Sequence, residues 1–304
     1  MTAAAALLGY ASAIGFLAPP LMVRSDWPRR SPALAVATWH ALTVSFTMAL
    51  ALAAYHLAVP AEHLHAGLTG LLHSCRLAAG PGSAPDPDTA DGLAVALPVF
   101  VVLLPLGSFV FEVLRARRVR SRHRRVLDIV GRRSAALRAT VVDHERPAAY
   151  CLPGYRSRVV VSDGALRLLS AGQLAAVLEH ERAHIAGRHH LAMAASEAFA
   201  RAFRWLPLAR HAREQTSVLL EMIADDHALR SHPRDVLATA LYEMATSGVP
   251  QGAFSAGGPG ALLRLQRVLA PGRRPHRALS MTVAATVAAV PLLPLLIGCA
   301  PVIG

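Results

Sequence analysis

The residues best suited to chemistry are His180, Glu181 and His184, which stand in the order H-E-x-x-H. Residues four apart lie on one face of an α-helix, so both imidazoles can reach the same metal ion. Glu181 projects about 100° away around the helix, where it can flank a zinc-activated water as general base. The alternative is a histidine-rich helix without metal, because His189 and His190 follow closely.

A second predicted helix, beginning near Thr216, carries the acidic side chains that can complete the donor set. Glu221 stands four residues before Asp225, so the two share a helix face. We predict that Glu221 is the third ligand of one Zn2+ per chain, and that Asp225 fixes the ring orientation of a zinc histidine. Glu214 and Asp226 are competing ligands, and a solvent-facing Glu221 is the simplest alternative.

The element that must position the two histidines is a helix beginning after Ser170. Ser170 and Gln173, three residues later, form a predicted capping box. An apolar stripe follows at helical spacing, which predicts a buried face; it consists of Leu174, Val177, Leu178 and Ile185.

The composition favours a membrane protein. Of 304 residues, 54% are hydrophobic and 16% are charged, whereas soluble domains carry about 25% charged residues. Disorder and a small disulfide scaffold are therefore excluded. About 20 apolar residues cross a bilayer as a helix. Four stretches qualify, at Ala3–Val23, Ala33–Val59, Leu93–Phe111 and Ala278–Ile297.

Arginine placement predicts the orientation of these spans, because cytoplasmic loops are rich in basic residues. Arginines gather between the first two spans, after the third span and before the fourth, whereas the loop 60–91 is rich in acids. We predict a multi-pass plasma-membrane protein with both termini outside and residues 115–277 in the cytoplasm. The basic clusters are assigned to the anionic leaflet of the lipid bilayer, with no nucleic-acid partner. The chain contains no lysine, which excludes lysine-based catalysis.

The segment from His180 to His184, with Glu221 and Asp225, resembles the HExxH…ExxxD pattern of the gluzincin membrane metallopeptidases. This group includes the HtpX and CAAX prenyl protease type and the BlaR/MecR-type antirepressor peptidases. The stretch Trp205–Leu208 resembles a W-x-P-L element of the BlaR/MecR group. Two further segments resemble the region before the zinc helix in both groups, at Ala149–Gly154 and Val159–Gly164.

The resemblance implies a mainly α fold: a multi-span membrane protein with a zincin-like α+β domain and a small β element beside the HExxH helix. Residues 1–114 would hold three spans with the outer loop 60–91, residues 115–277 the metallopeptidase domain, and residues 278–304 the fourth span and a short outer tail. The family's zinc ligands and general base match His180, His184, Glu221 and Glu181, and its later aspartate matches Asp225.

The resemblance also implies a strand beside the cleft whose edge pairs with an extended substrate; it comprises Arg158, Val159, Val160, Val161 and Ser162. The expected activity is hydrolysis of peptide bonds in a protein or peptide, with a cytoplasmic transcriptional repressor as one substrate. Membrane-protein quality control of the HtpX type is an alternative. A non-catalytic receptor or scaffold that retains a metal site is another, although three protein ligands favour catalysis over a structural site. The oligomeric state stays open.

Three details depart from the resemblance or stand apart from it. BlaR/MecR proteins carry an outer penicillin-binding domain with a Ser-x-x-Lys serine, and we expect this lysine-free sequence to lack that sensor domain. An acidic residue often follows the arginine after the HExxH helix in these families, whereas here Arg188 is followed by His189. Cys151 is predicted to be a small buried residue rather than a nucleophile.

Overall fold

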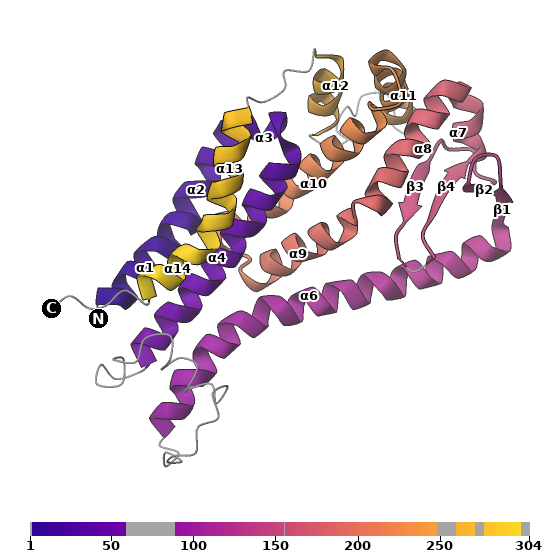
Figure 1. Ribbon diagram of the computed structural model, residues 1–304. Helices are drawn as coiled ribbons and strands as arrows, with labels where there is room; N and C mark the ends of the chain where they lie inside the picture. Colours follow the sequence, from indigo (N-terminus) through magenta and orange to yellow (C-terminus); the bar gives the residue numbers. More distant parts are fainter. Residues whose placement is uncertain (1, 59–88, 155, 248–259, 271–276, 299–304) are drawn as a thin grey trace.

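Helices make up most of the computed structural model, which describes residues 2–58, 89–154, 156–247, 260–270 and 277–298 (Figure 1). Four helical segments are long and apolar enough to cross a membrane, and they agree with the four predicted stretches; they are Ala3–Arg24, Pro32–Ala58, Ala96–Val130 and Met281–Gly298. The first comprises α1 (Thr2–Ser12), a π-helical turn η1 (Ala13–Leu17) and α2 (Ala18–Arg24). The others are α4 (Pro32–Ala58), α6 (Thr89–Val130), and α13 (Arg277–Ala289) with η3 (Val290–Leu292) and α14 (Leu293–Gly298).

The surface of α6 fits a lipid environment. None of its 18-residue apolar window is buried inside the protein. Large side chains such as Phe100, Leu103 and Phe111 are more than half exposed. Exposed apolar area on this scale is costly in water and favourable in hydrocarbon. The four candidate spans therefore fit a membrane protein. The predicted outer loop 60–91 and the tail after Gly298 fall largely or wholly on residues outside the described ranges.

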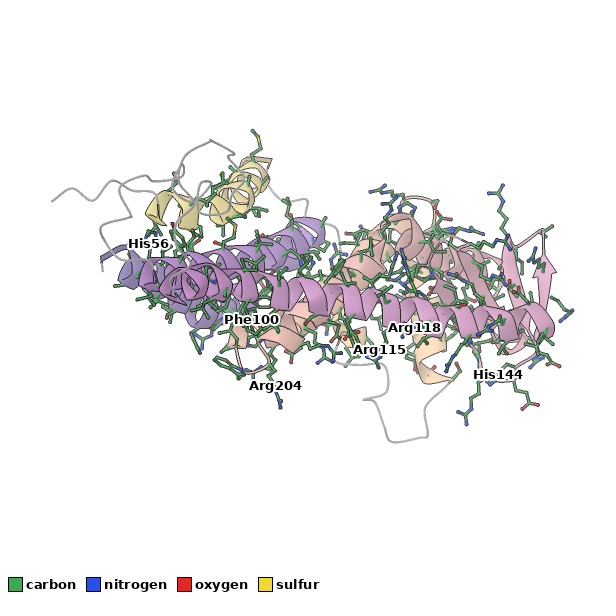
Figure 2. All side chains as sticks on the ribbon, turned by 90° about the horizontal axis from the view of Figure 1, so that it is seen from below. His56, Phe100, Arg115, Arg118, His144 and Arg204 are labelled. Atoms are coloured by element: carbon green, nitrogen blue, oxygen red, sulfur yellow. The ribbon has the colours of Figure 1, made fainter. Side chains whose placement is uncertain are left out.

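Helix α6 continues well beyond the span predicted to end at Phe111. It runs for 42 residues to Val130, about 63 Å at 1.5 Å per residue. The arginine-rich segment that follows the span is therefore a continuation of the same helix. Figure 2 shows Phe100 toward the end of the molecule that carries His56, with Arg115 and Arg118 further along and His144 near the far end.

A four-stranded sheet begins where α6 ends. Its strands are β1 (Gly131–Ser134), β2 (Ala139–Val142), β3 (Ala149–Leu152) and β4 (Arg158–Ser162), in the order β1-β2-β4-β3. Strands β2 and β4 are parallel, and the other two pairs are antiparallel. Strand β3 therefore has one unpaired side within the described sheet.

The sheet order corrects the prediction that the strand Arg158–Ser162 offers its edge to a substrate. This strand, β4, is hydrogen-bonded to β2 on one side and to β3 on the other. Its backbone groups are already used in ladders, so an extended peptide cannot add to it. The two edge strands of the described sheet are β1 and β3, and β3 is the one that contacts α8.

The two faces of the sheet pack against different helices. Val159 and Val161 lie in a core with Leu178 of α8 (Ala171–Ala186). Val160 points to the opposite face and packs with Leu127 of α6. This alternation follows from the two-residue period of a strand.

The remaining helices are α7 (Asp163–Leu168), α9 (His189–Ala202), α10 (Pro207–Ala228), α11 (Arg234–Thr246) and α12 (Ala261–Leu269), with a short α3 (Trp27–Arg30) between the first two spans. Of these, α9, α10 and α11 pack against α8. Phe199 of α9 and Phe203 just after it make edge-on contacts with Phe46 of α4, with ring centroids 6.0 and 5.3 Å apart. The amphipathic helix α9 therefore packs against the second candidate span.

Candidate metal centre

Helix α8 carries the HExxH residues and is held at both ends. At its start, the Ser170 hydroxyl accepts from the Gln173 backbone N–H, and the Gln173 side chain accepts from the Ser170 backbone N–H, so the predicted capping box is present. Leu174, Val177 and Leu178 are buried against the sheet as the stripe predicted. These contacts fix the rotation of α8 about its axis, and with it the direction in which the histidines point.

Two polar links tie α8 to its neighbours. Arg182, inside the HExxH motif, donates to the Leu137 carbonyl oxygen at 2.9 Å and so joins α8 to the β1–β2 turn. Glu179 lies 3.2 Å from Nε2 of His227 near the end of α10. Helix α10 begins at Pro207, whose fixed φ suits the first turn of a helix. It brings Glu221 opposite the two histidines of α8.

The structure brings His180, His184 and Glu221 together, with one candidate ligand atom from each lying within 4.8 Å of the others. The Nε2 atoms of the two histidines are 3.2 Å apart. The Glu221 carboxylate oxygens lie 3.4 Å from His180 Nε2 and 3.3 Å from His184 Nε2. Ligand atoms about 2.0–2.1 Å from a tetrahedral zinc ion stand about 3.3–3.4 Å from one another. Two imidazole nitrogens and a carboxylate at these separations therefore fit zinc.

Asp225 lies on the far side of His180 from this cluster. Its Oδ1 is 3.0 Å from His180 Nδ1, and its side chain is 1% exposed. A carboxylate on the second ring nitrogen of a histidine fixes the ring orientation and directs the other nitrogen toward a metal. The pairing of Glu221 with Asp225 one turn later thus places one acid on each side of His180.

An arginine that the sequence analysis assigned to the membrane surface completes the cluster. Arg264 of α12 donates through Nε and Nη2 to the two oxygens of Asp225, both at 2.8 Å. Its Nη1 lies 2.8 Å from Oε2 of Glu221. A planar guanidinium can bind one carboxylate with two parallel bonds and still reach a second. Arg264 therefore fixes both acids relative to each other.

The charges of this cluster shift its pKa values in a consistent way. Burial alone would raise the pKa of Asp225, but Arg264 and His180 lower it to about 2. Burial lowers the pKa of His184 to about 4, which keeps its imidazole neutral, as a metal ligand requires. Burial also disfavours charge on His180, yet Asp225 and Glu221 raise its pKa to about 9. The two acids therefore stabilise a positive charge at His180. They would stabilise a bound metal cation at this position for the same electrostatic reason.

Glu181 lies beside Cys151 of strand β3 and within electrostatic reach of His180. Burial raises the pKa of its carboxyl to about 7. The neighbouring side chain is Cys151 of β3, and burial together with the Glu181 carboxylate raises the pKa of that thiol to about 12. Cys151 is therefore a neutral thiol and a poor nucleophile at physiological pH, although it is only partly buried.

His189 occupies the position at which the resembling families often carry an acid. Its Nδ1 lies 2.9 Å from Nδ1 of His184. Arg188 adopts a left-handed conformation, with φ of 50°, which ends α8 and turns the chain back into α9. A Cβ on Gly187 would lie 2.5 Å from the His189 ring, so glycine leaves room for this return. His189 therefore contacts the outer nitrogen of His184, as Asp225 does for His180.

The two competing acids lie elsewhere. Glu214 is 57% exposed and lies 3.7 Å from His211. Asp226 faces α12, where Arg267 donates to both of its oxygens at 2.6 and 2.8 Å. Among the described residues, the cluster that can hold a metal ion is the one containing Glu221.

The roles of Arg264 and His189 at this site were not predicted from the sequence. Arg264 stands one helical turn before Val268, which is 1% exposed, so an arginine on the buried face of a short amphipathic helix was the available signal. His189 offered a weaker signal, because loop and helix-end histidines are common. The difference from the family pattern at His189 drew attention to this position, but it did not predict the contact with His184.

Residues 113–225 match the family model of peptidase family M48. The matched region contains His180, His184 and Glu221, and it ends at Asp225. The match therefore supports a metallopeptidase of that family, and the metal-compatible cluster agrees with it. Arg264 lies beyond the matched region. Neither the curated proteins nor the solved structures include a match to this chain.

Proposed function

We propose that this protein is an integral-membrane zinc endopeptidase in which His180, His184 and Glu221 hold the zinc ion and Glu181 is the general base. The observation that carries the proposal is the convergence of these three ligand side chains, with Glu181 on the adjoining face of the same helix. The match to a metallopeptidase family over the same residues supports it.

The chain's own residues divide the reaction between them. Zinc, when bound, lowers the pKa of water and polarises the scissile carbonyl. Glu181 takes the proton of the attacking water and passes it to the leaving amine. Its pKa of about 7, raised by burial, suits a group that must accept and release a proton near neutral pH. Asp225 and Arg264 hold His180 and Glu221 in place.

We assign the substrate-binding edge to β3 rather than β4. Ala149–Leu152 has an unpaired side within the described sheet, and Cys151 of this strand faces Glu181. An extended peptide added to this edge would receive backbone hydrogen bonds, and its scissile bond would run past the general base.

The proposed location is the plasma membrane, with the catalytic residues on the cytoplasmic side and both termini outside. The four apolar helices support a membrane protein, and the arginine distribution supports this orientation. One proposed role is the cleavage of a cytoplasmic repressor-like protein, as the likeness to antirepressor peptidases suggests.

A second candidate role is the quality control of membrane proteins. It is favoured by a cavity beside the candidate spans. This cavity of about 850 Å³ reaches Glu221 and Arg264 from the side of the candidate spans. Its wall includes Met22 and Val23, at the end of the first span, and Pro28 of α3. A substrate segment bound in this cavity would lie close to the bilayer. The part of a membrane protein next to one of its own spans lies at the same level, so it could enter the cavity.

The test of the proposed activity is Glu181→Gln in the full chain, purified in lipid nanodiscs. We expect the variant to keep one zinc per chain by elemental analysis and to hydrolyse casein about 1,000-fold more slowly. Glu145→Gln is the matched control, because Glu145 is exposed and lies in the β2–β3 connection. Hydrolysis by Glu181→Gln at the wild-type rate would refute the assigned base.

The two roles are separated in cells that express either the wild-type chain or Glu181→Gln. Under the repressor hypothesis, a soluble DNA-binding protein accumulates intact in the variant cells. Under the quality-control hypothesis, membrane proteins accumulate instead. Quantitative proteomics of soluble and membrane fractions distinguishes these outcomes.

A further inference from the structure

A cationic cavity of about 540 Å³ lies on the face of the sheet that packs against α6. It forms where α6 ends and the strands begin. We call it the arginine cavity; its lining residues are Arg124, Leu127, Asp128, Gly131, Arg133, Thr140, Arg156 and Arg158. Four arginines, contributed by α6, β1 and the segment at the start of β4, thus line one space together with a single acidic residue.

The charges of the arginine cavity are only partly compensated. Arg158 donates to Asp128 at 2.8 Å, and Arg124 donates to the Pro153 carbonyl oxygen at 2.7 Å. Arg133 and Arg156 form no direct hydrogen bond or ion pair among the described residues, and they act on the Asp128 carboxylate only at longer range. The buried Nε of Arg124 likewise lacks an acceptor. Like charges gathered in this way repel one another, so a bound anion would stabilise the cavity.

The backbone is shaped around this arrangement. Gly154 has a φ of 138°, a conformation that favours glycine, and a Cβ there would lie 2.5 Å from Nη2 of Arg124. A Cβ on Gly131 would lie 2.5 Å from the Thr140 side chain. Gly154 thus leaves room for the Arg124 side chain, and Gly131 leaves room for the close approach of β2.

We infer that the arginine cavity binds a small soluble compound carrying a diphosphate or triphosphate group. Arginine forms paired hydrogen bonds with phosphate oxygens, and several guanidiniums together match a polyphosphate better than a single carboxylate. The cavity volume lies within the range of about 300–1,000 Å³ typical of small-molecule sites.

The position of the cavity favours a soluble compound over a phospholipid headgroup. Arg115 is the first arginine after the apolar part of α6, and Arg124 stands about 13 Å further along the helix axis. Gly131, at the far side of the cavity, stands about 24 Å beyond Arg115. Figure 2 shows α6 passing from Phe100 through Arg115 and Arg118 toward the end that carries His144.

The arginine cavity is separate from the metal centre. Its strand residues Thr140 and Arg158 share the face of Val160, which packs on α6, whereas α8 covers the opposite face. Binding at the cavity therefore does not depend on the proposed peptidase activity, and either proposal can fail alone.

The experiment measures binding of inorganic tripolyphosphate and of ATP to the full chain in phosphatidylcholine nanodiscs, by calorimetry at 0.15 M salt. The test variant is Arg133→Gln with Arg156→Gln, which removes the two arginines that form no direct ion pair among the described residues. The matched control is Arg118→Gln with Arg122→Gln, which removes the same charge from exposed positions on α6 outside the cavity. We expect at least a tenfold weaker affinity in the test variant and less than a twofold change in the control.

In this titration, the inference would be overturned by no binding to the wild-type chain, by equal weakening in both variants, or by unchanged binding in the test variant. Wild-type zinc content in the test variant shows that it is folded. A parallel titration uses nanodiscs that contain phosphatidylglycerol. Loss of tripolyphosphate binding there, restored when the lipid is neutral, would assign the cavity to a lipid headgroup and refute a soluble ligand.

Discussion

The metal centre and the arginine cavity lie on opposite faces of one sheet and use arginine in opposite ways. At the metal centre, Arg264 is bound by two carboxylates and is only 16% exposed. In the arginine cavity, Arg133 and Arg156 line an open space and form no direct ion pair among the described residues, although both lie within electrostatic reach of Asp128. A compensated arginine fixes the shape of a site, whereas an uncompensated one is available to a ligand.

The difference has an energetic basis. Asp225 is almost fully buried, and a buried carboxylate is tolerated only when it is paired and hydrogen-bonded. Arg264 provides both the opposite charge and two hydrogen bonds for Asp225. Its loss should therefore affect folding as well as metal binding. The cavity arginines remain solvated while they are unpaired, so their loss should affect ligand binding and leave the fold intact.

The largest effect is expected at Glu221, because it is the one ligand that α10 contributes to the cluster. Glu221→Ala should lose its zinc in dialysis, measured by elemental analysis, and should lower casein hydrolysis by about 1,000-fold or more. Glu214→Ala, on the exposed side of the same helix, is the control and should keep its zinc. Full zinc retention by Glu221→Ala would assign the third ligand to another acid. Arg264 would then not be paired with a metal ligand, and the contrast with the cavity arginines would be lost.

The next largest effect is expected at Arg264. Arg264→Met leaves the buried Asp225 carboxylate without its cation, and breaking a buried pair in this way costs about 3–5 kcal/mol of folding free energy. Zinc affinity should also fall by about 10–100-fold, because both Asp225 and Glu221 lose their support. Thermal unfolding and competition with a zinc chelator measure the two effects.

A matched variant on the same helix sharpens this prediction. Arg267 also binds an acid through two bonds, but its partner Asp226 is 41% exposed. Arg267→Met should therefore cost less than about 1 kcal/mol. Equal destabilisation by the two variants would show that α12 acts only as a packing element, and that Arg264 has no particular role at the metal centre.

The local features of the metal centre could be predicted from the sequence, because they depend on helical spacing. The four-residue separation of His180 and His184, the capping box at Ser170 and the face shared by Glu221 and Asp225 all follow from 3.6 residues per turn. The candidate spans were equally predictable, because length and apolarity define them.

The features that the sequence did not reveal depend on tertiary pairing. Which of two short strands lies at the sheet edge is set by the strand order, and β4 proved to be interior. The run Val159–Val161 indicated that both faces of the strand are covered, which does not determine whether its edges are paired. Arg264 is 39 residues beyond Asp225, and only the packing of α12 on α10 brings them together. The arginine distribution could not separate lipid-facing, buried and cavity-lining side chains.

The smallest effect is expected at His189, and it tests whether a histidine can support a zinc ligand as Asp225 does. If His184 binds the metal through Nε2, its Nδ1 carries the proton and donates to Nδ1 of His189. His189 must then be neutral, and burial lowers its pKa in agreement. His189→Ala should weaken zinc binding about tenfold, whereas His189→Asp should restore or strengthen it, because a carboxylate is the stronger acceptor.

Gly187 provides an independent means of disturbing the same contact. Gly187→Ala places a methyl group where the His189 ring now lies, so the ring must move away from His184. Zinc affinity, measured by chelator competition, should fall in the same direction as in His189→Ala and by no more than that variant. His190→Ala is the control, because His190 makes no hydrogen bond to either zinc histidine within the described structure. A loss of affinity in His190→Ala equal to that in His189→Ala would mean that the start of α9 acts through packing, and that the outer nitrogen of His184 needs no specific partner.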